Sequence, residues 1–369
     1  MRIGYDAKRF FHNNTGLGNY SRDLVRILSE YFPENSYYLY NTKPSEKYSF
    51  LLNKKNTFER LPTSFLGKKL KSIWRMLWVN EQIQKDEIDI FHGLSGEIPI
   101  GMPKNIKSVV TIHDLIFVRY PHLYSFFDRK IHFLKFKYAA QKADCVIAIS
   151  EQTKQDIVQF LKINPEKIQV IYQGCSNIFK DRFSSEEKES IREKLNLPDE
   201  FILNVGTIEE RKNALTIVKA IKDLEIKLVL IGRKTKYYTQ IENYVREYGI
   251  EDKIIHLQGI SQRELAIIYQ LASIMIYPSI FEGFGIPIIE ALFSKTPVIT
   301  TNSGVFPEAG GPDSIYINPE DEKELEQKIK FLLHNPEICN SIAEKGYKFA
   351  QKFTDQNIAQ QLISLYAQL

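Results

Sequence analysis

The sequence predicts an α/β protein of two doubly wound, Rossmann-like domains, and three observations lead to this prediction. Its 369 residues exceed what one hydrophobic core usually organises. Short apolar runs alternate with amphipathic helical segments, the pattern of parallel sheets covered by helices on both faces. That pattern stops near residues 173–179 and then starts again. We therefore expect one domain at 1–172, joined by a last helix at 354–369, and a second domain at 175–353.

The first half opens with an apolar strand and then alternates in this way. A strand at 2–6 precedes a helix at about 18–31, and a long helix ends near residue 142. A basic amphipathic helix is expected at 66–84, with Leu70, Ile73, Trp74 and Leu77 on one apolar stripe and Lys68, Lys69, Lys71 and Arg75 beside it. Further strands are expected at 37–40, 88–91, 108–112, 145–149 and 167–172.

The second half repeats the alternation with clearer boundaries. Strands are expected at 201–205, 227–231, 253–257, 273–277, near 298 and at 315–317. Helices are expected at 212–222, 237–248, 261–270, 320–333, 336–352 and 355–368. Two doubly wound units that face each other would place the carboxyl ends of both sheets around a central cleft.

The stretch 277–297 is chemically the most specific part of the chain. Glu282 lies in a glycine-punctuated loop after an apolar strand, and Glu290 follows in a helix that Pro287 can begin. Free N–H groups and the positive dipole end of that helix form a seat for phosphate. Carboxylates repel phosphate, so the two glutamates are better suited to accept hydrogen bonds from hydroxyls. A nucleotide-sugar, with a diphosphate between two hydroxyl-rich rings, fits this arrangement.

Composition and charge narrow the possible functions. The chain has a formal net charge of +4, but residues 1–174 have 26 Lys and Arg against 17 Asp and Glu, and residues 175–369 have 23 against 28. The excess of basic residues in the first half favours an anionic partner or membrane surface. The alternative is that this charge only keeps the protein soluble. No nucleic-acid partner is expected. Three separated cysteines and the lack of a secretory signal or membrane span indicate a cytoplasmic protein, with a peripheral position on the inner face of the plasma membrane left open.

The two glutamates also connect the chain to a known family. Glu-Gly-Phe-Gly at the first glutamate and the second one eight positions later resemble retaining glycosyltransferase family 4 of the GT-B fold, particularly bacterial polysaccharide and O-antigen mannosyltransferases. The resemblance covers nearly the whole chain. It implies that Glu282 contacts sugar hydroxyls and that Glu290 binds the ribose hydroxyls. The backbone of Phe284, Gly285 and Ile286 would lie near the sugar and the diphosphate.

A basic pair follows the first strand of the second half. Gly206 ends that strand, and Arg211 and Lys212 lie where a helix is expected to begin. Arg can bind phosphate as a planar fork and Lys as a point charge, so the pair is suited to the diphosphate. A solvated helix start is the alternative. Thr207 stands where the family often has an arginine.

Two motifs of the first half also match the family. Gly16 and Gly18 resemble its N-terminal glycine-rich loop, whose backbone approaches the donor phosphates and the acceptor. His113 ends the strand at 108–112, where the family has a histidine that lines the donor-sugar pocket. A structural histidine is the alternative.

The resemblance implies transfer of a hexose, with mannose favoured, from a GDP- or UDP-linked donor to a polysaccharide or lipid-linked glycan. Retention would follow a front-face route, with Glu282, His113, Arg211 and Lys212 as catalytic residues. No metal and no cofactor are expected, because His-x-x-x-His and Asp-x-Asp are absent from the sequence. The alternatives are a catalytically silent nucleotide-sugar-binding subunit and a GT-B epimerase or phosphorylase.

Overall fold

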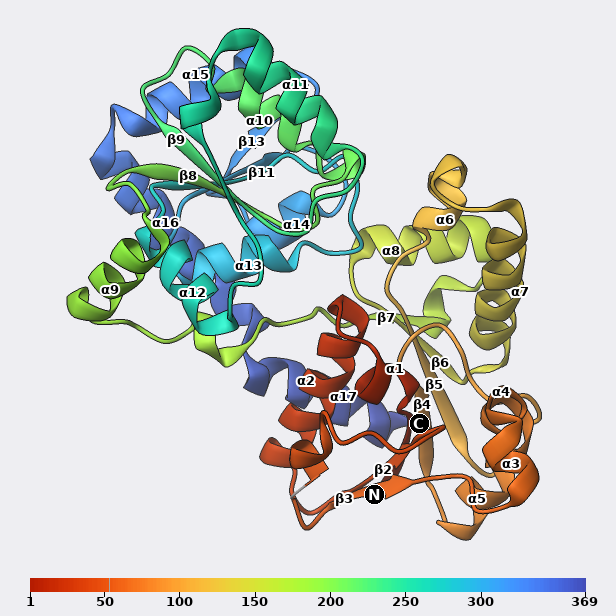
Figure 1. Ribbon diagram of the computed structural model, residues 1–369. Coiled ribbons are helices and arrows are strands. Elements are labelled where there is room, and N and C mark those ends of the chain that lie inside the picture. Colours follow the sequence, from red (N-terminus) through yellow and green to blue (C-terminus); the bar gives the residue numbers. More distant parts are fainter. Residues whose placement is uncertain (53) are drawn as a thin grey trace. The chain divides into compact units, whose positions relative to one another are not determined.

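The apolar runs of the sequence form two parallel sheets, each in its own part of the chain. The computed structural model describes residues 1–52 and 54–369 and divides into two units (Figure 1). The N-terminal unit comprises Met1–Gln173 and Asp355–Leu369, and the C-terminal unit comprises Gly174–Thr354. The chain therefore crosses between the units twice.

The N-terminal unit has a seven-stranded sheet in the order β3-β2-β1-β4-β5-β6-β7. All its strand pairs are parallel. Its strands are β1 (Arg2–Asp6), β2 (Ser36–Tyr40), β3 (Thr57–Arg60), β4 (Ile90–Gly93), β5 (Lys107–Ile112), β6 (Cys145–Ala148) and β7 (Ile168–Val170). Its helices are α1 (Lys8–His12), α2 (Gly16–Tyr31), α3 (Phe65–Lys69), α4 (Lys71–Ile73), α5 (Val79–Lys85), α6 (Ile116–Arg119), α7 (Phe126–Lys142), α8 (Glu151–Asp156) and α17 (Asp355–Gln368). Strand β3 and helix α1 were not predicted.

The C-terminal unit has a six-stranded parallel sheet in the order β10-β9-β8-β11-β12-β13. Its strands are β8 (Phe201–Val205), β9 (Lys227–Ile231), β10 (Ile254–Leu257), β11 (Ile274–Tyr277), β12 (Val298–Thr301) and β13 (Ile315–Ile317). Its helices are α9 (Ser185–Leu195), α10 (Ala214–Ala220), α11 (Tyr238–Tyr248), α12 (Gln262–Leu271), α13 (Ile286–Phe293), α14 (Phe306–Gly310), α15 (Glu322–Leu333) and α16 (Pro336–Ala350). Because every strand of this sheet runs the same way, the carboxyl ends of β8 and β11 meet at one edge.

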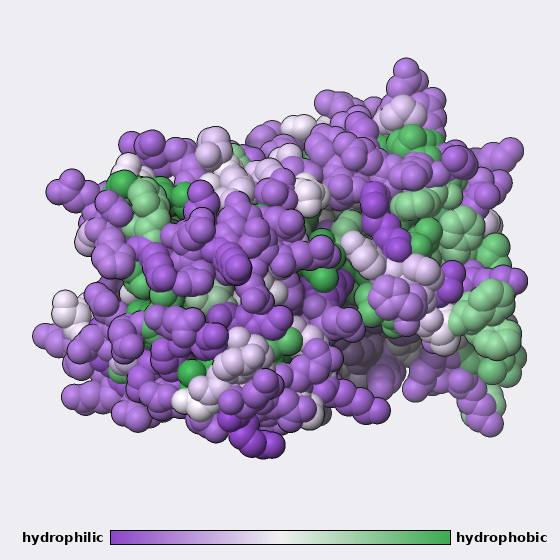
Figure 2. All heavy atoms as spheres, turned by 90° about the horizontal axis from the view of Figure 1, so that it is seen from above, coloured by the Kyte–Doolittle hydropathy of each residue, from purple (hydrophilic) through white to green (hydrophobic). Residues whose placement is uncertain are grey.

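The face seen in Figure 2 is mostly polar, with one gathering of hydrophobic side chains. Figure 2 shows hydrophobic side chains gathered near the right-hand margin of the view, while most of the rest of that face is hydrophilic. Within the described part of the chain, no helix combines the length and the apolar character that crossing a bilayer requires.

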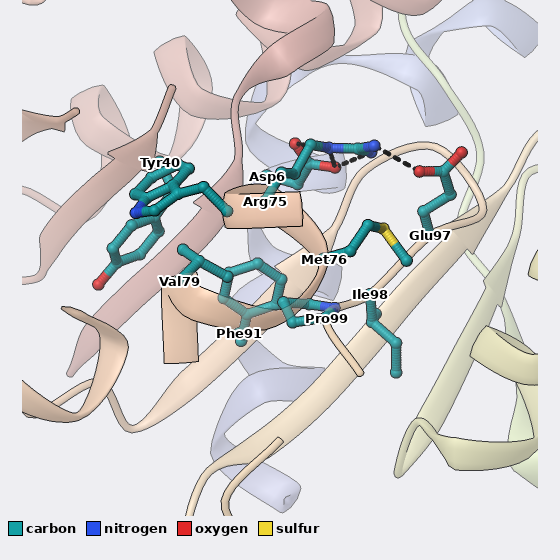
Figure 3. A pocket seen from close by; sticks show the side chains of 10 residues that line it. Asp6, Tyr40, Arg75, Met76, Val79, Phe91, Glu97, Ile98 and Pro99 are labelled. Carbon is teal, nitrogen blue, oxygen red and sulfur yellow. Dashed lines mark hydrogen bonds and ion pairs between the residues drawn. The ribbon is translucent and has the colours of Figure 1, made fainter. Parts of the chain in front are cut away.

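The basic helix predicted at 66–84 is interrupted, and this corrects the expected apolar stripe. Helices α3 and α4 are followed by a π-helical turn, η2 (Trp74–Trp78), which leads into α5. A π-turn adds a residue to the helical repeat and so rotates the side chains after it about the helix axis. Trp74 is buried in a cluster with Tyr40 and Phe91, and Arg75 turns inward between Asp6 and Glu97 (Figure 3). Leu70, Ile73 and Leu77 remain exposed.

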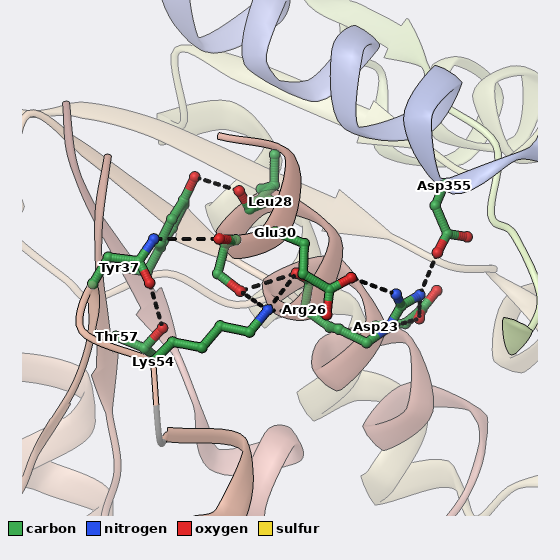
Figure 4. A network of polar contacts seen from close by, with 10 residues as sticks. Asp23, Arg26, Leu28, Glu30, Tyr37, Lys54, Thr57 and Asp355 are labelled. Carbon is green, nitrogen blue, oxygen red and sulfur yellow. Dashed lines mark hydrogen bonds and ion pairs between the residues drawn. The ribbon is translucent and has the colours of Figure 1, made fainter. Parts of the chain in front are cut away.

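The last helix belongs to the N-terminal unit, where α17 packs into the core beneath β1 and α2. Asp355, at its first position, accepts a hydrogen bond of 2.6 Å from Arg26, which also binds Asp23 and Glu30 (Figure 4). Near its end, the Tyr366 hydroxyl is 2.6 Å from Nδ1 of the buried His92. Polar contacts therefore fix this helix to α2 at its first end and to strand β4 at its last.

Two glycines bring the ends of β8 and β9 into close contact. Gly206 has φ +140° and Gly232 has φ +153°, a region that favours glycine. A Cβ atom at Gly232 would lie 1.9 Å from the carbonyl oxygen of Gly206. Only a residue without a side chain fits there.

Replacing Gly232 with Ala should therefore destabilise the protein by about 3 kcal/mol, because backbone strain adds to the collision with Gly206. Gly249→Ala is the matched control, since Gly249 also has positive φ (+64°) but has nothing within 4 Å of an added Cβ. It should cost about 1 kcal/mol. Urea unfolding of both variants checks this, and equal losses would contradict the close approach.

Candidate active site

The candidate site is built on the strand–loop–helix unit β11–α13 of the C-terminal unit. The buried strand ends at Tyr277, the loop contains Glu282, and α13 begins at Ile286 with Pro287 as its second residue. Gly285 precedes the helix with φ +123°, which a residue with a side chain rarely adopts. Ile288, Ile289 and Leu292 of α13 are buried, and the helix packs against β11, β12 and α16. The helix N-terminus is thereby held beside the glutamate loop.

Glu282 lies between two cations. Its Oε2 atom is 2.8 Å from Arg211 and its Oε1 atom is 3.0 Å from the Lys212 ammonium. Oε1 also accepts hydrogen bonds from the Tyr277 hydroxyl at 2.9 Å and from the Ser279 hydroxyl at 3.2 Å. The carboxylate is thus held by four side chains from the ends of two neighbouring strands.

These contacts set the ionisation of the group. Burial opposes ionisation of Glu282, but Lys212 and Arg211 outweigh it and lower the pKa to about 2. Burial alone would lower the pKa of Lys212, but Tyr277 and Glu282 raise it. The resulting pKa of Lys212 lies well above the ordinary value of a lysine. The glutamate is therefore an anion, and the lysine a cation, at any physiological pH.

Arg211 and Lys212 lie in a short 3₁₀ turn, η7 (Glu210–Lys212), between β8 and α10. Arg211 donates to the backbone oxygen of Phe281 and lies 2.7 Å from Glu209. Lys212 donates to the Tyr277 hydroxyl at 2.7 Å, and its side chain passes over Gly206, where an added Cβ would be only 3.0 Å from Nζ. The solvated helix start, the alternative from sequence, does not describe this pair.

Glu290 has a different environment on α13. Tyr269, a fully buried residue of α12, donates a hydrogen bond of 2.9 Å to its Oε2 atom. Burial raises the pKa of Glu290 to about 7, although the Tyr269 hydrogen bond and the charge of Lys212 oppose the shift. The two glutamates therefore differ in charge state near neutral pH.

The residues between the two glutamates are fixed mainly by packing. The Phe284 ring is buried and lies edge-on to Phe353, with ring centroids 5.5 Å apart. Its side chain is therefore part of the core, and only the backbone of Phe284, Gly285 and Ile286 is available for the role the resemblance implies.

Gly16 and Gly18 do not lie in a loop, which corrects the sequence-based expectation. Both are in the first turn of α2, which begins at Gly16 after Thr15. The Gly18 N–H donates to the Asn13 side chain at 3.1 Å. A Cβ atom at Gly18 would be only 1.9 Å from the backbone oxygen of Asn13. Close contact within the chain accounts for this glycine.

His113 has both ring nitrogens engaged. Nε2 donates to the Leu94 carbonyl at 2.9 Å, so Nδ1 accepts from the Gln173 amide at 3.0 Å. The Tyr20 ring meets it edge-on at 4.6 Å. Burial lowers the pKa of His113 to about 4, so the ring is neutral at physiological pH. These contacts favour the structural alternative for the imidazole nitrogens.

The hydrogen-bond partners of Glu282 and Glu290 were not all predicted from the sequence. Tyr277 and Ser279 bind Glu282, and Tyr269 binds Glu290. The position of Tyr277 at a strand end, five residues before Glu282, was the available signal. In the described part of the chain, no group of three or more His, Cys, Asp or Glu side chains lies together in a way that could hold a metal ion.

Comparison with known proteins agrees with this geometry. Residues 16–176 match the family model described as Glycosyltransferase Family 4, and residues 185–349 match that of Glycosyl transferases group 1. The chain belongs to these glycosyltransferases. It is 32% identical over 237 residues to the O-antigen chain mannosyltransferase RfbU of Salmonella typhimurium, covering 63% of each chain.

Further relatives extend the similarity along the chain. The chain is 26% identical over 302 residues to the serotype-specific mannosyltransferase WbdA of Escherichia coli, covering 76% of this chain and 36% of WbdA. It spans less than two thirds of both RfbU and WbdA. The crystal structure of Anabaena HepE in complex with UDP matches with a TM-score of 0.77 at 16% identity, over 100% of this chain and 99% of HepE, which shows the GT-B fold.

The opposite pKa shifts of the two glutamates predict opposite effects on stability when each is replaced. The raised pKa of Glu290 contributes stability that is present below about pH 4.5 and lost as the pH rises through about 7. Glu290→Gln should therefore stabilise the free protein by about 2 kcal/mol more at pH 8 than at pH 5. The lowered pKa of Glu282 contributes stability above about pH 4.5, lost as the pH falls through about 2. Glu282→Gln should cost about 3 kcal/mol at both pH values.

Urea unfolding at pH 5 and pH 8 measures both effects. Glu210 is an exposed carboxyl on the 3₁₀ turn that contains Arg211 and Lys212. Glu210→Gln therefore serves as the control, and its stability should change little. A Glu290→Gln variant that is equally stabilised at both pH values would contradict the raised pKa.

Proposed function

We propose that this protein is a retaining hexosyltransferase, with mannose favoured, that uses a GDP- or UDP-linked donor and a polysaccharide or lipid-linked glycan as acceptor. The observation that carries the proposal is the Glu282 carboxylate held by Arg211 and Lys212 beside the N-terminus of α13. RfbU is an O-antigen chain mannosyltransferase and WbdA a serotype-specific mannosyltransferase, which supports mannose and a glycan acceptor, and the UDP bound to HepE supports a nucleotide donor.

The donor would bind to the C-terminal unit, with its ribose at Glu290 and its diphosphate at the N-terminus of α13. Tyr269 is the hydrogen-bond donor that the described residues give to Glu290, and it occupies Oε2. Oε1 can therefore accept from the ribose hydroxyls. The N-terminus of α13 and the cations Arg211 and Lys212 provide positive charge for the diphosphate between the ribose and the sugar.

The remaining capacity of Glu282 suits a sugar hydroxyl. Three of its contacts fall on Oε1, and among the described residues Oε2 has Arg211 as its partner. An ionised carboxylate has about four lone-pair sites on two oxygens, so Oε2 can accept another bond. With its pKa near 2, Glu282 is an acceptor and not a proton donor.

Transfer would then depend on positioning and charge. In the front-face route the acceptor oxygen attacks the anomeric carbon from the side of the departing diphosphate, whose oxygen takes the acceptor proton. The anomeric carbon–oxygen bond to phosphate breaks and a glycosidic bond forms with the same configuration. Arg211, Lys212 and the helix N-terminus would stabilise the charge on the leaving diphosphate, the work that a metal does elsewhere.

A donor panel tests the proposal directly. The protein is incubated with GDP- and UDP-linked hexoses, and nucleoside diphosphate release and the anomeric configuration of the product are followed by NMR. Slow donor hydrolysis without acceptor and retained configuration are expected. A panel in which no nucleotide-sugar is bound or cleaved would overturn the proposal and leave the silent subunit, and an inverted product would overturn the front-face route.

Arg211→Ala and Lys212→Ala should each lower turnover at least ~10²-fold, the scale of losing one group that stabilises developing charge. Lys219→Ala is the control, because Lys219 lies on α10 nearby but pairs with Glu322 on the surface. Activity should survive EDTA. Loss of activity in EDTA that Mn²⁺ or Mg²⁺ restores would show that these cations do not replace a metal.

Glu290→Gln should raise the Michaelis constant for the donor more than it lowers turnover. A group that binds ribose holds the ground state and the transition state alike, so its loss weakens binding uniformly. Steady-state kinetics with varied donor decides this. If turnover alone falls while the Michaelis constant stays the same, Glu290 does not bind the ribose.

We also propose that the protein associates peripherally with an anionic membrane surface through residues 65–78. Leu66, Leu70, Ile73 and Leu77 are exposed there, together with Lys68, Lys69 and Lys71. No acidic residue lies between positions 61 and 80. Exposed apolar and basic side chains together favour binding to anionic lipid.

A further inference from the structure

A second apolar surface of the N-terminal unit lies on and before helix α7. Leu123, Tyr124, Phe126, Phe127, Ile131 and Leu134 are all exposed, with Phe127 at 76% and Leu134 at 66% of their full accessible area. Exposed aromatic and aliphatic side chains that gather in this way mark an interaction site, whereas single ones need no explanation. The exposed large apolar residues of the C-terminal unit are scattered over different elements, as at Tyr248, Ile280, Phe331 and Ile338.

The α7 surface contains a hollow of about 480 Å³ between α6 and α7. Phe117, Val118, Phe126, Phe133 and Leu134 form its apolar wall, with Arg129 and Lys130 beside them. The Nε atom of Arg129 is buried and has no hydrogen-bond partner among the described residues. A buried donor without a partner is costly, so the Arg129 guanidinium beside the hollow is a group that an acceptor would stabilise.

Lysines follow two phenylalanines of α7, the exposed Phe126 and the partly buried Phe133, one helical turn later. The Lys130 ammonium is 4.6 Å from the centre of the Phe126 ring, and that of Lys137 is 5.8 Å from Phe133. Helix α7 has five basic residues and one acidic residue, Asp128. A lysine can lay its stem along an apolar side chain and keep its charge further out. The helix therefore offers apolar rings with a layer of positive charge above them.

The α7 surface and residues 65–78 are linked through Glu97. Glu97 accepts hydrogen bonds from Arg75 of the π-turn and from Lys135 of α7, the latter at 3.3 Å. The two segments therefore flank one carboxylate, and Figure 1 shows α3, α4 and α7 on the same side of the sheet. Lys69 lies 4.8 Å from the Phe65 ring centre, so the Phe–Lys pairing recurs on α3.

We propose that the α6–α7 surface binds the leaflet of an anionic bilayer, with an acyl chain in the hollow and lipid phosphates at Arg129, Lys130 and Lys137. The proposal rests on the membrane association proposed above and places its larger part on α7. Charge selects this occupant. A second copy of the chain would bring two strongly basic helices together, and like charges oppose that contact. Phosphates at the level of the lysines complement them.

Vesicle flotation with the full chain tests the proposal, using phosphatidylcholine vesicles with and without phosphatidylglycerol at low and high salt. The wild type should float with the anionic vesicles and release in high salt. A Phe126→Ser, Phe127→Ser and Leu134→Ser variant should bind at least about tenfold more weakly, as should Lys130→Glu with Lys137→Glu. Phe331→Ser with Ile338→Ser and Lys323→Glu with Lys345→Glu are matched controls on the C-terminal unit and should bind as the wild type does.

Other outcomes overturn the proposal in distinct ways. Equal flotation on both vesicle types, or none, excludes an anionic leaflet. If Lys68→Glu, Lys69→Glu and Lys71→Glu together abolish binding while both α7 variants bind normally, the contact belongs to residues 65–78 alone. A dimer in light scattering that the Phe126, Phe127 and Leu134 variant makes monomeric indicates a second copy as the partner. Donor hydrolysis, measured on every variant, should be unchanged, and its absence from the wild type would remove the transferase proposal without touching this one.

Discussion

The contact on which the candidate site depends is the ion triplet of Glu282, Arg211 and Lys212. Two buried cations at neighbouring positions would repel each other and would not stay together without an anion between them. Glu282 supplies that anion, and Tyr277 donates to it while accepting from Lys212. The loop after β11 and the turn after β8 are thereby held together, although they lie about seventy residues apart in sequence. The triplet therefore organises this end of the sheet for an anionic ligand before any ligand binds.

The second glutamate shows how strongly local partners decide the chemistry. Glu282 and Glu290 come from one strand–loop–helix unit, and burial raises the pKa of both. Two cations close to Glu282 reverse that effect. Glu290 has a neutral hydroxyl from Tyr269 and only the more distant charge of Lys212, so burial prevails. A carboxyl that is close to half ionised at neutral pH can adjust to a ligand that supplies hydroxyl donors, whereas Glu282 is fixed as an anion.

Much of the fold could be predicted from the sequence, and the reasons for the exceptions are physical. Parallel strands buried on both faces, such as β8 and β9, form continuous apolar runs with clear bounds. The glutamate pair could be found because glycines and a proline mark the loop and the helix start. The π-turn could not be found, since a helical stripe in sequence does not show a single added residue. Tyr269 and Tyr277 were missed because buried tyrosines are common in cores, and only the fold brings their hydroxyls to carboxylates.

Two interruptions, the break at Leu70 and the π-turn, let one short segment serve both the interior and the surface. In an uninterrupted helix, Trp74 would continue the apolar stripe of Leu70, Ile73 and Leu77, and Arg75 would lie beside it among the lysines. The helix breaks at Leu70 (φ −99°, ψ 55°), before the π-turn, and after this break Trp74 lies in the core and Arg75 reaches Asp6 and Glu97, where its charge is neutralised. The lysines before the turn keep their exposure, and so do the three aliphatic side chains. Since Glu97 also binds Lys135 of α7, the same buried network sets the positions of both apolar and basic segments on this side of the N-terminal sheet.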